Sequence, residues 1–355
     1  MHPLARIRSI PALLLGLSVI ATTQIGLAPT GFAAAKSSSS FNEPVAIAAS
    51  GSYVWVANVG GNSVTELDAA TGKVVRVINA TADGIKTPVA LAATSTNVWV
   101  ANDGVRGSQS GTGSLTELNA RNGSLVRVKT DQLDNPSAIA VSGDAVWITN
   151  QQTSVKGSVT VVNAASGAVT RVIHSASDDF VGPVSVVSRG DDVWVASSGG
   201  NNPDGNGKDQ GSVTELNSAT GSVVRIVDTR TAQFDTPTAM VLSGPDLWIA
   251  NLDFSSIVEL NASTGALVRF IKAGSLDQPL SMTVCGADVW VADYFSNSVT
   301  ELLRSTGKVV RVVSSSLKQP GGIACSGGHV WVTNGPKNSV TELRASNGSL
   351  VRVIK

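Results

Sequence analysis

The 355-residue sequence contains few of the residues on which catalysis and nucleic-acid binding usually depend. Histidine occurs three times and cysteine twice, and charged residues make up only 15% of the chain. Lysine and arginine form no basic patch, so the electrostatic attraction that drives nucleic-acid binding is missing. We therefore expect no nucleic-acid partner.

Long hydrophobic runs are missing after the N-terminal region. That region has two early arginines, a largely apolar stretch from Ile10 to Ala28, and a small-residue cleavage site at 33–35. Polar residues at 22–24 interrupt the apolar stretch, so we expect residues 1–35 to be a signal peptide, not a membrane anchor. No later stretch is long enough to span a bilayer. The mature chain is expected to be slightly acidic, secreted to the extracellular or periplasmic space, without a transmembrane segment, and monomeric.

The sequence is rich in glycine, with 35 copies, and it contains an internal repeat. Hydrophobic residues make up 42% of the chain, which suits an all-β protein with many tight turns and argues against disorder. Seven units each begin with a proline, and a tryptophan always follows with ten residues between the two. The pairs are Pro44/Trp55, Pro88/Trp99, Pro136/Trp147, Pro183/Trp194, Pro237/Trp248, Pro279/Trp290 and Pro320/Trp331.

Each unit reads as four short strands, which we call a, b, c and d. In the first unit they are predicted at 45–48, 53–57, 63–67 and 74–78, with Gly72 taking the positive φ that a bulged c–d hairpin needs. Four strands at a period of 41 to 54 residues indicate an all-β, seven-bladed β-propeller of antiparallel blades, one contiguous repeat per blade. The propeller is expected to span residues 44–355 after a short linker at 36–43. That linker either stays outside the blades or adds a closing strand.

Two sets of repeated residues are interpreted as structural. The seven tryptophans are expected to wedge adjacent blades together, since a buried tryptophan is worth several kcal/mol of stability. Glutamates on strand c and arginines on strand d recur ten residues apart, as in Glu66/Arg76 and Glu342/Arg352. We expect these to be cross-strand charge pairs on outer strands, each contributing about 0.2–1 kcal/mol.

The repeat also resembles known families. Runs such as Val54-Trp55-Val56-Ala57-Asn58, Asn62-Ser63-Val64-Thr65-Glu66-Leu67 and Thr71-Gly72-Lys73-Val74-Val75 resemble the YVTN-type propeller repeats of bacterial surface and exported proteins. The Pro and Trp-Val elements also resemble the streptogramin-lyase propellers. That second resemblance would imply a His/Glu set with a bound divalent metal, and no histidine here matches such a position. Both resemblances imply the fold and leave function open.

Length variation falls almost entirely on one face, where the b–c loops and d–a connections are expected to lie. The b–c loops are long and glycine-rich at 103–113 and 197–211, with a shorter insertion at 151–157. Because binding residues concentrate on loops that a rigid scaffold positions, this face is the predicted site, although tolerated surface insertions are an equal alternative. The binding-face candidates are Asp103, Arg106, Asp204, Asp209, Asp253, Phe254, Asp293, Tyr294 and Phe295.

Two further features leave alternatives open. The segment 202–207, with Asp204 and Asn206, resembles the start of a calcium loop, but Val213 stands where its closing glutamate should be. Asp209 or Glu215 could substitute for that glutamate, so this segment is either a calcium site or a flexible polar loop. No other cofactor is expected. Cys285 and Cys325 lie at nearly equivalent positions in neighbouring blades, and either form a disulfide or remain two free thiols.

The preferred function is a non-catalytic exported scaffold that binds a protein, glycan or cell-envelope polymer through the variable face. No residue is assigned a catalytic role in this hypothesis. The alternative is a metal-dependent lyase or lactonase-like enzyme that uses loop carboxylates, and the second alternative is a structural cell-envelope protein. Metal-dependent turnover would favour the enzyme, whereas saturable binding unaffected by chelation would favour the scaffold.

Overall fold

The computed structural model describes residues 40–79, 84–104, 113–151, 157–174, 180–199, 211–228 and 232–355. The signal peptide predicted at 1–35 lies outside these ranges. Within them the chain folds into strands β1 to β28, and a short 3-10 helix, η1 (Gly335–Lys337), lies in the last blade. Within these ranges, no helix is long and apolar enough to cross a membrane.

The strands divide into seven blades of four. Blade 1 contains β1 (Pro44–Ser50), β2 (Tyr53–Asn58), β3 (Ser63–Asp68) and β4 (Val74–Asn79). Blade 2 contains β5 (Pro88–Ala93), β6 (Asn97–Asn102), β7 (Ser114–Asn119) and β8 (Leu125–Lys129). Blade 3 contains β9 (Pro136–Ser142), β10 (Ala145–Asn150), β11 (Ser158–Asn163) and β12 (Val169–His174). Blade 4 contains β13 (Pro183–Arg189), β14 (Asp192–Ser197), β15 (Ser212–Asn217) and β16 (Val223–Asp228).

The remaining three blades follow the same plan. Blade 5 contains β17 (Pro237–Ser243), β18 (Asp246–Asn251), β19 (Ser256–Asn261) and β20 (Leu267–Ile271). Blade 6 contains β21 (Pro279–Cys285), β22 (Asp288–Asp293), β23 (Ser298–Leu303) and β24 (Val309–Val313). Blade 7 contains β25 (Pro320–Ser326), β26 (His329–Asn334), β27 (Ser339–Arg344) and β28 (Leu350–Ile354).

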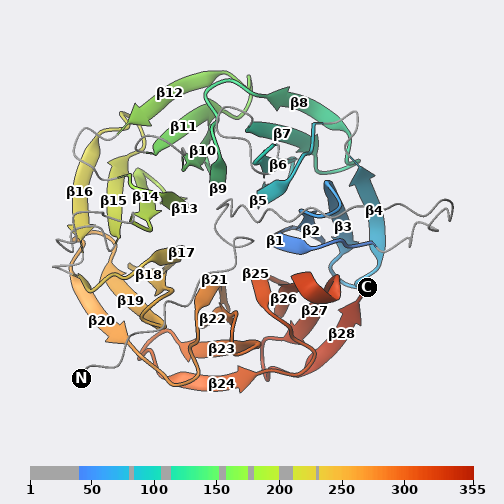
Figure 1. Ribbon diagram of the computed structural model, residues 1–355, viewed down its shortest axis with the longest axis vertical. Coiled ribbons are helices and arrows are strands. Elements are labelled where there is room, and N and C mark those ends of the chain that lie inside the picture. The colour runs from blue at the N-terminus through green and yellow to red at the C-terminus, as the bar shows by residue number, and fades with distance from the viewer. Residues whose placement is uncertain are drawn as a thin grey trace, which may run out of the picture.

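Each blade is an antiparallel meander in sequence order, and the seven sheets form a ring around a central axis (Figure 1). Strand a of every blade lies nearest the axis, and strand d forms the outer rim. The predicted seven-bladed β-propeller with one contiguous repeat per blade is therefore confirmed. Within the described residues no sheet mixes strands from the two ends of the chain.

The c–d hairpin shows how the local sequence sets the blade. Gly72 has φ +67° and donates its N–H to the carbonyl oxygen of Asp68 at 2.8 Å. The side chain of Asp68 accepts hydrogen bonds from the backbone N–H and the hydroxyl of Thr71. Glycine takes the left-handed backbone without steric cost, so the turn closes as the sequence predicted.

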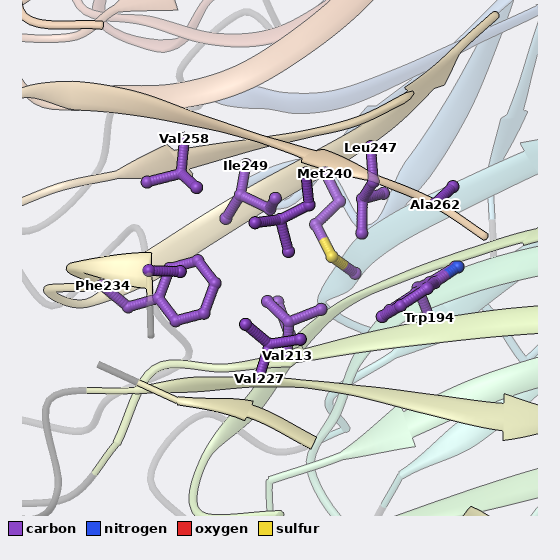
Figure 2. Close-up of a cluster of buried hydrophobic side chains, with 12 residues drawn as sticks. Trp194, Val213, Val227, Phe234, Met240, Leu247, Ile249, Val258 and Ala262 are labelled. Atoms are coloured by element: carbon purple, nitrogen blue, oxygen red, sulfur yellow. The ribbon is translucent and has the colours of Figure 1, made fainter. Parts of the chain in front are cut away.

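The tryptophans expected to wedge the blades lie in the spaces between them, and each is at most 1% exposed. They are Trp55, Trp99, Trp147, Trp194, Trp248, Trp290 and Trp331. None of these rings is therefore offered to a ligand at the surface. Trp194 of blade 4 belongs to one cluster with Met240 and Leu247 of blade 5, and Phe234 lies at the opposite end of that cluster (Figure 2).

The other six tryptophans repeat this arrangement around the ring. Each belongs to a cluster that includes the second residue of strand b in the next blade. The pairs are Trp55 with Val98, Trp99 with Val146, Trp147 with Val193, Trp248 with Val289, Trp290 with Val330, and Trp331 with Val54. Each cluster thus spans two blades, which makes the junctions a major source of hydrophobic stability.

A second ring of buried side chains lies three residues before each proline, at positions to which the sequence pattern assigned no role. Its members are Phe41, Ile85, Leu133, Phe180, Phe234, Leu276 and Leu317, all at most 5% exposed. Phe41 packs against Trp331 and Val54 between blades 7 and 1. The described residues 40–43 thus belong to the propeller and are not a free linker, although they form no strand.

The glutamate–arginine pairs hold neighbouring blades together. The predicted cross-strand register is present, with Glu66 opposite Arg76 and their Oε2 and Nε atoms 2.7 Å apart. The pair joins the two outer strands as expected, and the Glu66 side chain in it is fully buried. Arg76 also donates from Nη2 to the carbonyl of Arg121 in blade 2, and a Cβ on Gly123 would lie 2.7 Å from its Cδ. The arginine therefore connects a buried carboxylate to the next blade's c–d turn.

The same contacts close the ring between blades 7 and 1. Arg352 donates from Nη2 to the carbonyl of Ala70 at 3.3 Å, and the backbone N–H of Glu43 donates to Asn338 Oδ1 at 2.8 Å. A Cβ on Gly322 would lie 2.9 Å from the Val45 carbonyl oxygen, so only glycine allows the two inner strands to approach this closely.

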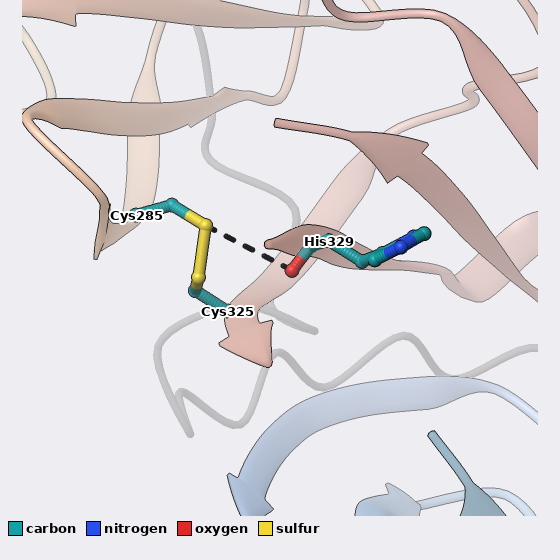
Figure 3. Close-up of a disulfide and its surroundings, with 3 residues drawn as sticks. All are labelled: Cys285, Cys325 and His329. Carbon is teal, nitrogen blue, oxygen red and sulfur yellow. Dashed lines mark hydrogen bonds between the residues drawn. A yellow bond between two sulfur atoms is a disulfide. The ribbon is translucent and has the colours of Figure 1, made fainter. Parts of the chain in front are cut away.

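Blades 6 and 7 are also linked covalently. A disulfide joins Cys285, at the end of β21, to Cys325 in β25, with Cα atoms 5.5 Å apart (Figure 3). The Cys285 sulfur lies 3.9 Å from the carbonyl oxygen of His329. No free cysteine is present in the described chain.

Candidate functional site

The candidate site lies at the end of the propeller where every strand a begins, which we call the loop face. The d–a and b–c connections lie on this face, and the a–b and c–d turns lie on the opposite turn face. Every b–c connection leaves and returns at the same register. Asn58 pairs with Ser63 across a short connection, and Ser197 pairs with Ser212 across a long one. Insertions therefore change the loop face without changing the blade beneath it.

The three long connections occur in consecutive blades, 2 to 4. The candidate residues Arg106, Asp204, Asn206 and Asp209 lie in the parts of these connections outside the described ranges, as does most of the proposed calcium segment. Their positions stay predictions. The ends of the connections are described, and they show how the loops are attached.

Blades with short connections use a side chain to reach the next blade. Asn62, the last residue of the blade 1 connection, has φ +47° and accepts a 2.7 Å hydrogen bond from the backbone N–H of Thr87. Asn297 and Asn338 accept the equivalent bonds in blades 6 and 7, and the hydroxyl of Ser255 does so in blade 5. Each donor is the residue directly before the next blade's proline.

Blades with long connections use backbone contact instead. The position of Asn62 is occupied by Gly113, Gly157 and Gly211 in blades 2 to 4. A Cβ on Gly157 would lie 2.3 Å from Pro183 Cδ, and its N–H donates to the Phe180 carbonyl at 2.7 Å. The returning chain thus packs directly on the next blade's proline, where only glycine fits.

Of the described candidates, Asp253 and Phe254 lie on the surface of blade 5. Phe254 is 38% exposed, and Asp253 accepts a 2.7 Å hydrogen bond from the Thr236 hydroxyl. Burial, followed by the charge of Asp253, raises the pKa of neighbouring Asp235. Asp103 is half-buried at the start of the blade 2 connection, and its N–H donates to the Thr87 carbonyl.

Two other candidates are not surface groups. Asp293 is fully buried and accepts a 2.7 Å hydrogen bond from the Thr300 hydroxyl, and Tyr294 is only 6% exposed. Asp293 occupies the position of a buried asparagine in other blades, such as Asn58, which donates to the equivalent threonine. Burial is the main reason that the pKa of Asp293 is raised to about 7. The prediction that these two residues present themselves to a ligand was wrong.

Phe295 remains half-buried at the surface of blade 6. Its ring meets the buried ring of Tyr294 edge to face, with centroids 5.4 Å apart. The aromatic pair therefore anchors the short connection and leaves part of one ring accessible.

A small pocket in blade 3 brings together polar residues that are distant in sequence. It has a volume of about 270 Å³ and is lined by Gln132, Asp134, Ser158 and His174, among others. His174 is exposed at the end of β12, and Ser158 is its cross-strand partner. From the sequence, His174 was expected to be only a solvated residue of the loop face. The tertiary structure places the d–a segment that contains Asp134 beside it, and no local pattern in the sequence indicates this.

The described residues contain no group of three or more His, Cys, Asp or Glu side chains that could hold a metal ion. His329 lies on the turn face, where its Nδ1 is 2.7 Å from Glu342 Oε1, and is therefore far from the loop-face carboxylates. The described scaffold thus offers hydrogen-bonding and aromatic groups for binding and a single pocket histidine for chemistry.

No protein-family model matches the sequence, and no curated protein matches it. Solved structures share its fold. Hydrazine synthase from Kuenenia stuttgartiensis is similar at 17% identity with a TM-score of 0.69, over 89% of this chain and 99% of that chain. Virginiamycin B lyase from Staphylococcus aureus, solved as an inactive variant with quinupristin, is 16% identical with a TM-score of 0.66, over 84% and 94% of the two chains. A streptogramin B lyase is 16% identical with a TM-score of 0.67, over 86% and 94%. At these identities the similarity shows the seven-bladed fold alone.

Proposed function

We propose that this chain is an exported, non-catalytic scaffold that binds a protein, glycan or cell-envelope partner through its loop face. The observation that carries the proposal is the confinement of every long connection to the loop face of three consecutive blades. The blades themselves repeat one register throughout. Sequence variety is therefore concentrated where a rigid platform presents it.

The attachment of the loops supports this proposal. Their ends are held by strand pairs such as Asn150 with Ser158, and by the glycine contact on the next blade's proline. Lengthening a loop between fixed ends costs little additional entropy, so a propeller tolerates such insertions without losing its blades. Exposed Asp253 and Phe254 continue the same arc of surface into blade 5 and would contribute a charged and an aromatic contact.

The test is a pull-down of partners from the producing cell's envelope and culture fluid with the mature protein. A trimmed variant replaces residues 103–113 and 198–211 with the blade 1 connection Val59-Gly60-Gly61-Asn62. The terminal asparagine of each graft is designed to provide the side-chain acceptor that Asn62 offers to the next blade. We expect the parent to retain a partner that the trimmed variant loses.

The matched control carries Arg121→Ala and Lys308→Ala on the turn face and should retain the partner. Circular dichroism and thermal unfolding of both variants establish that the blades are intact. A partner retained equally by the parent, the trimmed variant and the control would refute binding through the long connections. Binding that survives chelation and occurs without turnover supports a scaffold over an enzyme.

A metal-dependent lyase or lactonase-like activity is the second candidate. The blade 3 pocket, which brings His174 and Asp134 together, is the observation that favours it. A screen of lactone and cyclic peptide substrates with added divalent metals would test it, with His174→Ala as the matched variant. Turnover by the parent that is lost in this variant would favour the enzyme.

A further inference from the structure

The axis of the propeller encloses a cavity of about 270 Å³ beside the loop face. All seven inner strands contribute to its wall through the residue directly after the proline. These residues are Val45, Val89, Ser137, Val184, Thr238, Leu280 and Gly321. At roughly 30 Å³ each, about nine groups the size of a water molecule or a methylene would fill this volume.

The wall of this axial cavity is mostly apolar, and Ser281 adds one hydroxyl to it. Ala46, Ala90 and Ala239 line it alongside the valines. The two hydroxyls of the ring are already used, because Ser137 donates to the Pro183 carbonyl at 2.6 Å and Thr238 donates to the Pro279 carbonyl at 2.8 Å. Among the residues that the structure describes, no charged side chain lines the cavity. An ion inside it would lose hydration without gaining a charged partner, whereas a hydrocarbon would gain by leaving water.

Two amides stand at the loop-face end of the cavity. Asn135 precedes Pro136 and Gln151 follows β10, and the Gln151 N–H donates to the Asn135 carbonyl at 3.0 Å. This backbone bond fixes the two residues side by side. Their side-chain amides make no hydrogen bond with any other residue of the described chain. Together they offer neutral donors and acceptors beside an apolar space.

We propose that the axial cavity binds a small uncharged amphiphile. An aliphatic body of roughly eight carbon atoms occupies the ring, and a neutral head group with both donor and acceptor atoms meets Asn135 and Gln151. The site is built from inner strands and two flanking residues, and of these only Gln151 belongs to a long connection, one that the trimmed variant leaves unchanged.

Isothermal titration of the mature protein with octanamide tests this proposal, with octanoate as the charged ligand of nearly equal size. We expect octanamide to bind saturably with one site per chain, and octanoate to bind at least tenfold more weakly. Val89→Phe and Val184→Phe fill the cavity from different blades and should abolish octanamide binding. The control Val224→Phe places the same change on the outer rim, where the side chain is 49% exposed, and should leave binding unchanged.

Gln151→Leu removes the head-group contact without filling the cavity and should weaken octanamide binding several-fold. This variant decides the question if the phenylalanine variants fail to fold. The proposal is overturned if the parent does not bind octanamide or binds octanoate equally well. It is also overturned if folded cavity-filling variants, or Gln151→Leu, bind octanamide like the parent.

Discussion

The contact between a b–c connection and the next blade is of one kind in blades 2 to 4 and of another kind in blades 1, 5, 6 and 7. Where the b–c connection is short, an asparagine or serine side chain bonds the backbone N–H before the next proline, as Asn62 does with Thr87. Where the connection is long, a glycine such as Gly157 packs its backbone against that proline. Both kinds of contact attach the end of a b–c connection to the start of strand a in the next blade.

The difference shows what an insertion requires. An inserted loop must leave and return at one register, and its last residue must still meet the next blade. A glycine lets the chain return from a long loop at van der Waals distance from the next blade's proline, since no Cβ intervenes. The joining residue therefore follows the length of the loop, while a buried tryptophan is common to all seven junctions. Blade 3 keeps the arginine contact through Arg171, although Val161 replaces the glutamate there.

Removing a tryptophan tests the feature that both classes of junction share. We expect Trp55→Ala, at a short-connection junction, and Trp194→Ala, at a long-connection junction, each to lower the free energy of unfolding by about 3–5 kcal/mol. Urea denaturation of the two variants and the parent measures this. A cost that differs by more than about 2 kcal/mol between them would mean that the junctions are not equivalent in their cores.

Adding a methyl group to the returning glycine tests the long-connection device. Gly157→Ala places a Cβ 2.3 Å from Pro183 Cδ and 2.7 Å from the Asn150 carbonyl oxygen, so we expect a loss of about 1–3 kcal/mol from overpacking. Gly274→Ala is the matched control because nothing lies within 4 Å of its added Cβ. It should be neutral or slightly stabilising. Equal effects at both positions would contradict the close-contact role of Gly157.

The blades also differ in the charged residues near the turn face, and this difference should affect how the stability of the protein depends on pH. In blade 6 the carboxyl of Glu301 shares a hydrogen bond with that of Asp288, whereas Asn97 occupies the position of Asp288 in blade 2. Burial is the main cause that raises the Glu301 pKa from 4.5 to about 7, the Arg311 charge opposes it, and Asp288 adds to it. Glu259 behaves in the same way, and the pKa of Asp293 is also raised to about 7.

These raised values predict a protein that is more stable in mild acid. The folded chain keeps protons that the unfolded chain releases, so stability should fall as the pH rises from about 4.5 to 7 and then level off. The slope is at most about 1.4 kcal/mol per pH unit for each such proton. Urea denaturation across this range measures it, and Asp288→Asn should flatten the profile. Stability that rises between pH 5 and 7 in the parent would refute the prediction.

Removing the asparagine side chain tests the short-connection device and has the smallest expected effect. Asn62→Gly keeps a residue that tolerates the positive φ but loses the bond to Thr87, so we expect a cost of about 0.5–1.5 kcal/mol. Asn297→Gly in blade 6 should cost a similar amount, because Asn297 bonds the N–H of Gln319 at 2.9 Å. Thermal unfolding that is unchanged in both variants would show that these bonds do not join the blades.

Because the chain repeats one unit seven times, much of the fold could be predicted from the sequence. The predicted strands of the first unit, 45–48, 53–57, 63–67 and 74–78, agree with β1 to β4 within two residues at each end. The ring of bulky residues three before each proline was also present in the sequence. Aligning the units on their prolines would have found it, whereas aligning them on strand c would have found the glycine, asparagine or serine that precedes that strand.

Other features of the site could not be read from the sequence. Asp293 ends strand β22 and Tyr294 follows it, where binding residues are often found, yet Asp277 and Gln278 of the d–a connection bond to them and both are buried. His174 and Asp134 line one pocket only because the d–a connection that leads into blade 3 packs against that blade's own outer strands. The burial of Glu66 also depends on the adjacent blade, whose turn covers its arginine.

The sequence by itself determined the number of blades, the strand register and the placement of insertions, because these follow from local periodicity and turn chemistry repeated seven times. Only the tertiary structure decided which polar groups are buried, how one blade joins the next, and that the ring leaves an apolar cavity on its axis. Those properties depend on the distance between blades, and that distance is set by the packing of side chains from different repeats.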